Sequence, residues 1–100
     1  MVYTLQKSDA FAKWLKGLRD LKAKARILVR LDSVRLGNLG DIKSVGSGIW
    51  EMRVHAGPGY RLYFVRKKEQ IVILLCGGTK ASQRSDIAKA KRIASEIEDD

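Results

Sequence analysis

The chain has 100 residues, which is the length of one domain and excludes a multidomain enzyme. Its one cysteine excludes a disulfide framework, and its one histidine excludes a metal site built on two histidines. Hydrophobic residues make up 45% of the chain, enough for a small core, yet no apolar run reaches the roughly 18 residues of a transmembrane helix. The first residues also lack the apolar segment of a signal peptide, so we expect a single cytosolic domain over residues 1–100 that contacts no membrane.

The net charge is the feature of the composition that points to a partner. Twenty lysines and arginines stand against eleven aspartates and glutamates, a net charge of +9. The excess falls in two segments: residues 11–35 hold eight basic and two acidic residues, and residues 61–85 hold six basic and one acidic residue. A small domain with this charge typically has a polyanionic partner, most often nucleic acid and sometimes an acidic protein.

The first half of the chain has the pattern of one strand followed by two helices. Residues 2–5 are a short apolar segment, which predicts a strand at or next to a sheet edge. Ser8 is a good N-cap for a helix that ends near Gly17. The apolar residues of this helix recur at i, i+3, i+4 and i+7: Phe11, Trp14, Leu15 and Leu18. Asp20 can cap a second helix, and so short a connection predicts an antiparallel helical hairpin.

The second helix should present two different sides. We expect its apolar side to hold Leu21, Ala25, Leu28 and Leu31. A cationic stripe at i, i+4 and i+8 lies on another side: Lys22, Arg26 and Arg30. Such a stripe is most simply a solvated helix face, and it is also suited to binding a phosphate backbone through counterion release.

The second half of the chain reads as four strands and a final helix. Strands are predicted over residues 41–45, 49–55, 60–66 and 71–76, and the last of these is apolar throughout, as in a strand covered on both faces. Ser82 or Ser85 caps the final helix. The order β-α-α-β-β-β-β-α predicts an α+β fold, in which helices pack on a twisted, mainly antiparallel sheet.

The two middle strands can be paired by their alternating pattern. With a three-residue loop over residues 57–59, His55 faces Arg61 and Arg53 faces Tyr63 on one polar face. A polar sheet face is usually just solvated, but two neighbouring arginines repel each other, which is unusual for such a surface and makes an anion site the alternative. Further polar residues follow the last strand and come close to the same face: Lys80, Gln83, Arg84 and Asp86.

Several segments of the chain resemble the RelE/ParE toxin superfamily, and within it the HigB-like addiction module killer proteins. The resemblance covers nearly the whole chain and is carried by the following segments: Gly37-Asn-Leu-Gly-Asp-Ile-Lys-Ser-Val-Gly46, Glu51-Met-Arg-Val54, Gly57-Pro-Gly-Tyr-Arg-Leu-Tyr-Phe64, Leu74-Leu-Cys-Gly-Gly-Thr-Lys80, Ser82-Gln83 and Asp86-Ile87. The resemblance implies the toxin of a type II toxin–antitoxin system. It also implies a helix-turn-helix, HigA-like antitoxin as partner, together with the ribosome and mRNA.

RelE-like toxins cut mRNA on the ribosome without a metal or another cofactor. The 2′-hydroxyl attacks the adjacent phosphorus and leaves a 2′,3′-cyclic phosphate, which requires a base, an acid and positive charge on the phosphorane. By the resemblance, Arg61 and Arg53 stabilise that charge and Lys80 holds a phosphate. The tyrosine of RelE on the last helix aligns near Ile87 and is absent here.

The base and the acid therefore have two candidates in this sequence. His55 has a side chain with an unperturbed pKa of about 6.5, and Asp86 is the alternative. The resemblance and the charge pattern together indicate a larger set of RNA-binding residues: Tyr63, Lys43, Gln83, Arg84, Lys22, Arg26 and Arg30.

Two other functions are compatible with the same sequence. A ParE-like protein would inhibit DNA gyrase with this fold and without nuclease chemistry, because fold does not determine function. A basic domain without chemistry of its own would use its charge to bind an acidic antitoxin or ribosomal RNA. Intact mRNA together with inhibited supercoiling would distinguish the first of these from a nuclease.

Overall fold

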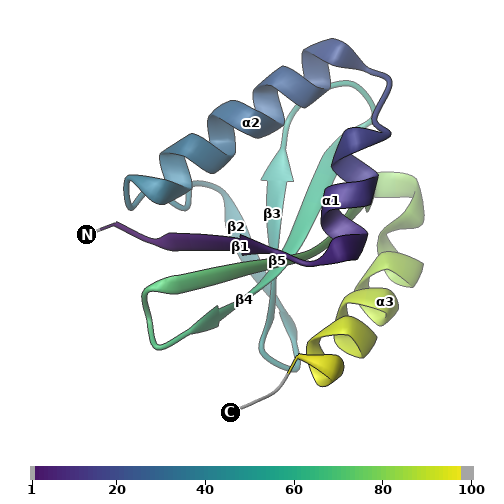
Figure 1. Cartoon of the computed structure of the whole chain (residues 1–100). Coiled ribbons are helices and arrows are strands. Elements are labelled where there is room, and N and C mark those ends of the chain that lie inside the picture. Colours follow the sequence, from purple (N-terminus) through teal and green to yellow (C-terminus); the bar gives the residue numbers. More distant parts are fainter. Residues whose placement is uncertain (1, 98–100) are drawn as a thin grey trace.

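The computed structural model describes residues 2–97 as one five-stranded sheet with helices on both faces (Figure 1). The elements follow each other in this order: β1 (Thr4–Lys7), α1 (Asp9–Lys16), α2 (Leu21–Arg35), β2 (Ile42–Gly46), β3 (Ile49–Val54), β4 (Tyr60–Lys67), β5 (Ile71–Thr79), the 3-10 turn η1 (Lys80–Ser82) and α3 (Gln83–Glu96). The predicted α+β class and element order are confirmed. Within the described residues, no helix combines the length and the apolar character needed to cross a membrane.

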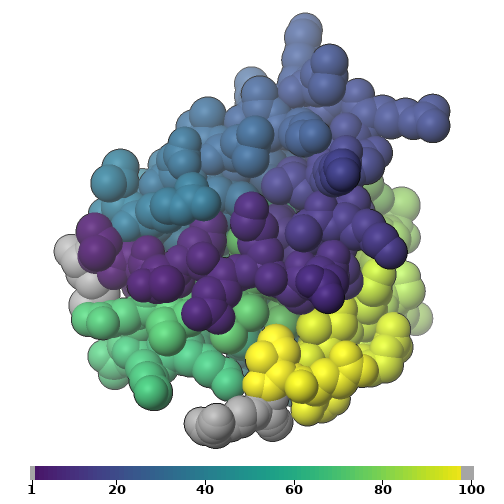
Figure 2. Space-filling view, in the orientation of Figure 1, coloured from purple at the N-terminus to yellow at the C-terminus, as the bar shows by residue number. Residues whose placement is uncertain are grey.

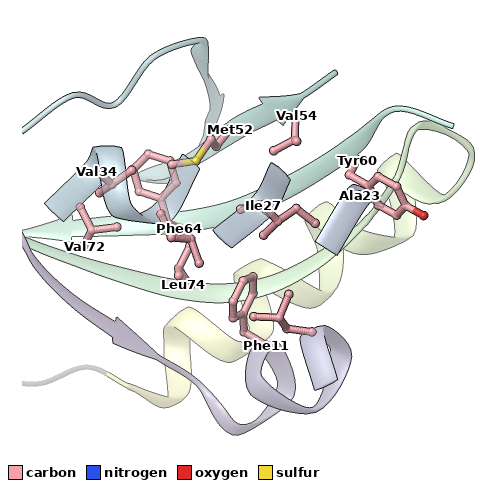
Figure 3. Packing of buried hydrophobic residues seen from close by; sticks show 13 residues of the cluster. Phe11, Ala23, Ile27, Val34, Met52, Val54, Tyr60, Phe64, Val72 and Leu74 are labelled. Atoms are coloured by element: carbon pink, nitrogen blue, oxygen red, sulfur yellow. The ribbon is translucent and has the colours of Figure 1, made fainter. Parts of the chain in front are cut away.

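The strand order in the sheet is β1-β5-β4-β3-β2. Only the pair of β1 and β5 is parallel, and β1 lies at the sheet edge as predicted. Helices α1 and α2 cover one face with a core around Ile27, Phe64 and Leu74 (Figure 3). Helix α3 covers the other face through Ala90 and the side chains around it. The molecule therefore has three layers, and each face of the sheet has its own core.

The starts of α1 and α2 agree with the capping signals in the sequence, whereas Ser82 stands at the N-cap position of α3 without a side-chain cap bond. The Ser8 hydroxyl accepts a hydrogen bond from the Phe11 amide at 3.0 Å, and the Asp20 carboxylate accepts one from the Ala23 amide at 3.1 Å. Side-chain caps of this kind contribute about 1 kcal/mol each. Ser8 also donates its hydroxyl proton to the Leu75 carbonyl at 2.6 Å, which ties the start of α1 to β5.

Strand β5 is buried from Val72 to Gly78, which confirms that it is covered on both faces. Its register with β4 shifts by one residue between Leu74 and Cys76, as in a β-bulge. Past this bulge, Gly77 lies against the Trp14 ring of α1, and a Cβ at this position would overlap that ring. Cys76 is a buried core thiol, and burial together with the charge of Asp86 raises its pKa to about 11.

The predicted apolar side of α2 was right for Leu31 and wrong for its other three residues. The helix buries Ala23, Ile27, Leu31 and Val34. Leu21 is 76% exposed and Leu28 is 45% exposed. The cause is that α2 carries two apolar sides, so its own pattern does not determine which of them meets the sheet.

Arg30 helps to determine the rotation of α2 about its axis. Its guanidinium donates to three carbonyl oxygens, those of Leu39, Asp41 and Arg53, at 2.9, 3.3 and 3.1 Å. These bonds hold the Arg30 side of the helix against the ends of β2 and β3. The side with Ile27 then faces the core.

The predicted register of β3 and β4 was also wrong, by two residues. The strands are joined by a five-residue loop over residues 55–59, and Arg53 pairs with Arg61 instead of Tyr63. The Ala56 amide donates to the Val54 carbonyl and the Gly59 amide to the Ala56 carbonyl, so the loop contains two successive turns. A shift of two residues keeps every side chain on its predicted face and changes only its partner.

Candidate functional site

The site is built on a row of residues that crosses three strands on the face covered by α3. Arg53 of β3 is paired with Arg61 of β4, and Arg61 is paired with Gly78 of β5. Residues that lie directly opposite each other across strands have neighbouring side chains, and two like charges in such positions repel. The row therefore needs a compensating negative charge.

Glu51 supplies this negative charge from beneath the two arginines. Its side chain is fully buried, and its carboxylate lies 3.3 Å from Nε of Arg53 and 3.5 Å from Nε of Arg61. It also accepts hydrogen bonds from the Tyr63 hydroxyl at 3.3 Å and from the Gln83 amide at 2.6 Å. A buried carboxylate is stable only with such partners. The Glu51 carboxylate therefore holds four side chains in place.

Both arginines contact Glu51 through their Nε atoms. At 3.5 Å the contact of Arg61 is an ion pair that is too poorly aligned for a hydrogen bond, and Nε of Arg61 has no hydrogen-bond partner among residues 2–97. Nη1 of Arg61 donates to the Gly59 carbonyl at 3.2 Å. The side chain of Arg53 is 33% exposed and that of Arg61 14%. Arginine Nη groups at the surface are suited to binding the oxygens of an anion.

Lys80 is joined to the same row through the loop between β3 and β4. Its backbone amide donates to the Gly59 carbonyl at 2.9 Å, the oxygen that also accepts the bond from Arg61. Lys80 itself is exposed. Gly59 has a φ of 81°, a conformation that favours glycine, and a Cβ here would come within 3.4 Å of the Arg61 guanidinium.

Asp86 lies over the β5 end of the row. A Cβ on Gly78 would overlap the Asp86 carboxylate, so the glycine makes room for this group on the sheet. The Ser82 hydroxyl donates to Asp86 at 2.5 Å and fixes the orientation of the carboxylate. The structure thus brings together a set of five polar groups from four elements: Arg53, Arg61, Lys80, Asp86 and Gln83.

Tyr63 corrects the prediction that its ring is available to RNA. The side chain is fully buried, and its hydroxyl is used by Glu51. Burial and the nearby Glu51 charge raise the pKa of Tyr63 well above the usual value of about 10, so the hydroxyl keeps its proton as a donor. Tyr63 supports the arginines from below.

His55 corrects the predicted pairing with Arg61. It lies in the loop after β3, and its Nε2 is 3.0 Å from the Asp41 carboxylate. The hydrogen bond with His55, and to a lesser extent the charges of Arg53 and His55, lower the pKa of Asp41. The side chain of His55 is 77% exposed. Because the loop has five residues instead of three, the strand partner of Arg61 is Arg53, two residues before His55.

The predicted RNA-binding residues fall into two groups. Lys43 of β2 is paired with Glu51 and exposed, and Arg84 is exposed in the first turn of α3. Both belong to the elements that frame the site. Lys22, Arg26 and Arg30 lie on α2, which packs on the opposite face of the sheet.

The three basic residues of α2 are not equivalent. Lys22 is exposed, whereas Arg26 donates to the His55 carbonyl at 3.0 Å. Arg30 is occupied by its three carbonyl bonds, and burial lowers its pKa despite the charge of Asp41. Two of the three cations therefore hold α2 against the strand ends.

Glu51 is a central residue of the site that was not predicted from the sequence. It shares the alternating face of β3 with Arg53, a signal that was present in the sequence. A register that pairs Arg53 with Tyr63 puts Glu51 opposite Val65, an apolar residue that indicates no polar partner. In the observed register it faces Tyr63, and a carboxylate next to a tyrosine and two arginines indicates a buried polar centre.

The fold is that of the toxin RelE. The structure of a RelE variant from Escherichia coli in the free state superimposes with a TM-score of 0.72, covering 94% of this chain and all of that one at 20% identity. YafQ of E. coli matches with a TM-score of 0.55 over 81% of this chain and 97% of that one, at 17% identity. In the toxin–antitoxin complex RelBE2 of Mycobacterium tuberculosis, a chain matches with a TM-score of 0.54 over 81% of this chain and 94% of that one, at 20% identity.

The sequence identifies the family more narrowly than the fold. Residues 13–97 match the phage-derived Gp49-like proteins (DUF891), and the chain belongs to this family. An uncharacterized protein of Haemophilus influenzae is 44% identical over 97 residues, which are 97% of this chain and 98% of that protein. The family match over residues 13–97 includes every residue of the site.

Proposed function

We propose that the chain is the toxin of a type II toxin–antitoxin system, in the HigB-like branch of the RelE/ParE superfamily, and that it cuts mRNA on the ribosome. The observation that carries this proposal is the pair of arginines held over a buried carboxylate, with Lys80 and Asp86 beside it. Three cations beside the Asp86 carboxylate match the needs of phosphoryl transfer by a 2′-hydroxyl. We assign no metal or cofactor to the reaction.

In the proposed reaction, Asp86 takes the proton of the 2′-hydroxyl as that oxygen attacks phosphorus. We choose Asp86 over His55 because its carboxylate lies on Gly78, the strand partner of Arg61, whereas His55 is bound to Asp41. Arg53 and Arg61 then stabilise the charge of the phosphorane. Such preorganised donors typically contribute about 3 kcal/mol each to transition-state stabilisation.

The departing 5′-oxygen needs a proton as its bond to phosphorus breaks. Guanidinium groups keep their protons, so of the three cations only the Lys80 ammonium can supply one. The products are a 2′,3′-cyclic phosphate and a 5′-hydroxyl. Lys43, Gln83 and Arg84 would contact the neighbouring nucleotides from the edges of the site.

The proposed partners are an antitoxin, the ribosome and mRNA. Two structures with this fold are described as toxin–antitoxin complexes, RelBE2 of M. tuberculosis and RelBE of E. coli. The latter matches with a TM-score of 0.51 over 77% of this chain at 18% identity. A HigA-like antitoxin with a helix-turn-helix domain is the expected form here, and the net charge of +9 suits ribosomal RNA as a docking surface.

Primer extension on total mRNA after induction tests the proposal. The wild-type chain should produce new 5′ ends, and Arg61→Ala should remove them and restore growth. Arg19→Ala is a matched control, because Arg19 is an exposed arginine in the loop between α1 and α2 and should leave cleavage intact. Growth arrest with intact mRNA would overturn the proposal, and inhibited DNA supercoiling in the same cells would identify a ParE-like activity instead.

A further inference from the structure

The outer side of α2 carries a second apolar stripe that the rest of the described chain leaves uncovered. We call the following residues the α2 stripe: Leu21, Ala25, Leu28, Val29 and Leu36. Positions 21, 25, 28 and 29 are spaced i, i+4, i+7 and i+8, which places them on one side of the helix. In Figure 2 the blue segment that contains α2 lies along the upper surface with no other element over it. Val29 is 64% exposed and Leu36 77%.

The stripe is continuous with a groove between α2 and the end of β3. Ala25, Arg26, Val29 and Arg30 of α2 line this groove, together with residues of the strand ends: Asp41, Arg53, Val54 and His55. Half of these residues are charged, and they expose mainly their carbon atoms to the groove. The groove has a volume of about 560 Å³ and a mostly apolar lining. A helix with apolar residues on two sides is normally buried on both, and an exposed apolar surface beside a groove marks an interaction site.

The charges around the stripe select the kind of partner. Helix α2 has five basic residues and one acidic residue, a net charge of +4: Lys22, Lys24, Arg26, Arg30 and Arg35 against Asp32. Packing two copies of this helix against each other would place one charge of +4 against another, so a second copy of the chain is a poor occupant. A nucleic acid would use the cations and leave the leucines exposed to water.

We propose that the α2 stripe and its groove bind an amphipathic helix of a partner protein, with apolar residues against the stripe and acidic residues beside them. Helices bind apolar grooves in this way with anchor residues three and four positions apart. No stripe residue takes part in the proposed cleavage, although Arg53 of the candidate site lines the groove beside the stripe. In one respect the inference rests on the proposed function, because an antitoxin would be a source of such a helix.

A display library of helical peptides tests the proposal on the full-length chain. The peptides of the library vary at the apolar positions and at the positions that flank them. Peptides that also bind the double variant Leu28→Ser/Val29→Ser are removed by counter-selection. Both residues are exposed, and circular dichroism checks that the variant folds. Val2→Ser is the matched control, since Val2 is 65% exposed and lies outside the stripe.

We expect enriched peptides to combine apolar residues at helical spacing with neighbouring Asp or Glu. Fluorescence anisotropy with the best peptide should show affinity that falls about tenfold or more in the double variant, falls with added salt and is unchanged in Val2→Ser. No enrichment, enrichment without acidic residues, or equal affinity for the double variant would overturn the proposal. A wild-type dimer that the double variant dissociates in sedimentation velocity would overturn it in favour of self-association. Loss of binding to a single-stranded RNA in the same variant would overturn it in favour of an RNA surface.

These readouts separate the inference from the proposed function. Peptide binding by Arg61→Ala at wild-type strength, with cleavage lost, is expected if both proposals hold. A wild-type chain that cuts mRNA and binds no peptide contradicts the inference alone. A chain that binds the acidic peptide and leaves mRNA intact contradicts the nuclease alone.

Discussion

The two faces of the sheet are organised by different forces. On the face under α3, the polar groups gather around the buried carboxylate of Glu51, which is bound by four side chains from β3, β4 and α3. On the face under α1 and α2, the interior is apolar, and polar contacts such as those of Arg30 lie at its margin. Hydrogen bonds and ion pairs are directional, so they fix the positions of the side chains that they join. Apolar packing mainly provides stability. The difference explains why the candidate site lies on the first face.

The substitution Glu51→Ala should break the polar face most severely. It would leave the charges of Arg53 and Arg61 uncompensated next to a buried cavity, and breaking such a group typically costs about 3–5 kcal/mol. Urea unfolding should show this loss in the free energy of unfolding. Glu51→Gln, which keeps the shape and two acceptor contacts, should cost less, and equal losses in the two variants would contradict a role for the charge.

Ile27→Ala should break the apolar face while leaving the site intact. Ile27 is fully buried under α2, and removal of such a side chain costs about 3 kcal/mol through lost transfer energy and the cavity left behind. Where the variant is still folded, its mRNA cleavage should equal that of the wild type. A loss of cleavage in the folded variant would show that the two faces are coupled.

Tyr63→Phe should distinguish support of the arginines from simple packing. The change removes one hydroxyl that donates to Glu51 and should cost about 1–2 kcal/mol, because a buried acceptor loses a partner. A calorimetric scan measures the stability. Cleavage should fall while the circular dichroism spectrum is unchanged, and a variant with full activity would mean that the arginines do not depend on this contact.

The contact between His55 and Asp41 should give the smallest effect, and one that depends on pH. The pKa of Asp41 is lower in the folded chain than its unfolded value of about 3.9. The contribution of Asp41 to stability is therefore fully present at a pH above the unfolded pKa, and it is lost as the pH falls through the folded pKa. The groups are exposed, so the effect is small. Asp41→Asn should flatten the acid limb of stability against pH, and His55→Ala should flatten it in part.

Local signals in the sequence were enough to predict much of this fold. Ser8 and Asp20 cap the helices that they were expected to cap, because a short side chain needs only the next turn of backbone. The apolar run of β5 indicated a strand covered on both faces, and the structure covers it with α1 and α3. Each of these features depends on residues close together in the chain.

The features that could not be predicted depend on distant parts of the chain. The side of α2 that meets the sheet is set partly by bonds from Arg30 to carbonyls beyond the helix, and the sequence of α2 alone favours the stripe with Leu21 and Leu28 as readily. The partner of Arg61 depends on the number of turns in the loop over residues 55–59. A five-residue loop and a three-residue loop place the same side chains on the same face of the sheet. The alternating pattern therefore predicts the face on which Arg61 lies, but does not predict its partner on the neighbouring strand.

At the adjacent glycines of β5, Gly77 and Gly78, the sheet has no side chain on either face. The Trp14 ring rests on Gly77 from one side, and the Asp86 carboxylate rests on Gly78 from the other. Two neighbouring positions therefore exclude a side chain for unrelated reasons. An alanine at residue 77 would displace an aromatic ring of the apolar layer, and an alanine at residue 78 would displace a proposed proton acceptor. Mutational scanning of this dipeptide would therefore report on the apolar core at one residue and on the polar site at the next.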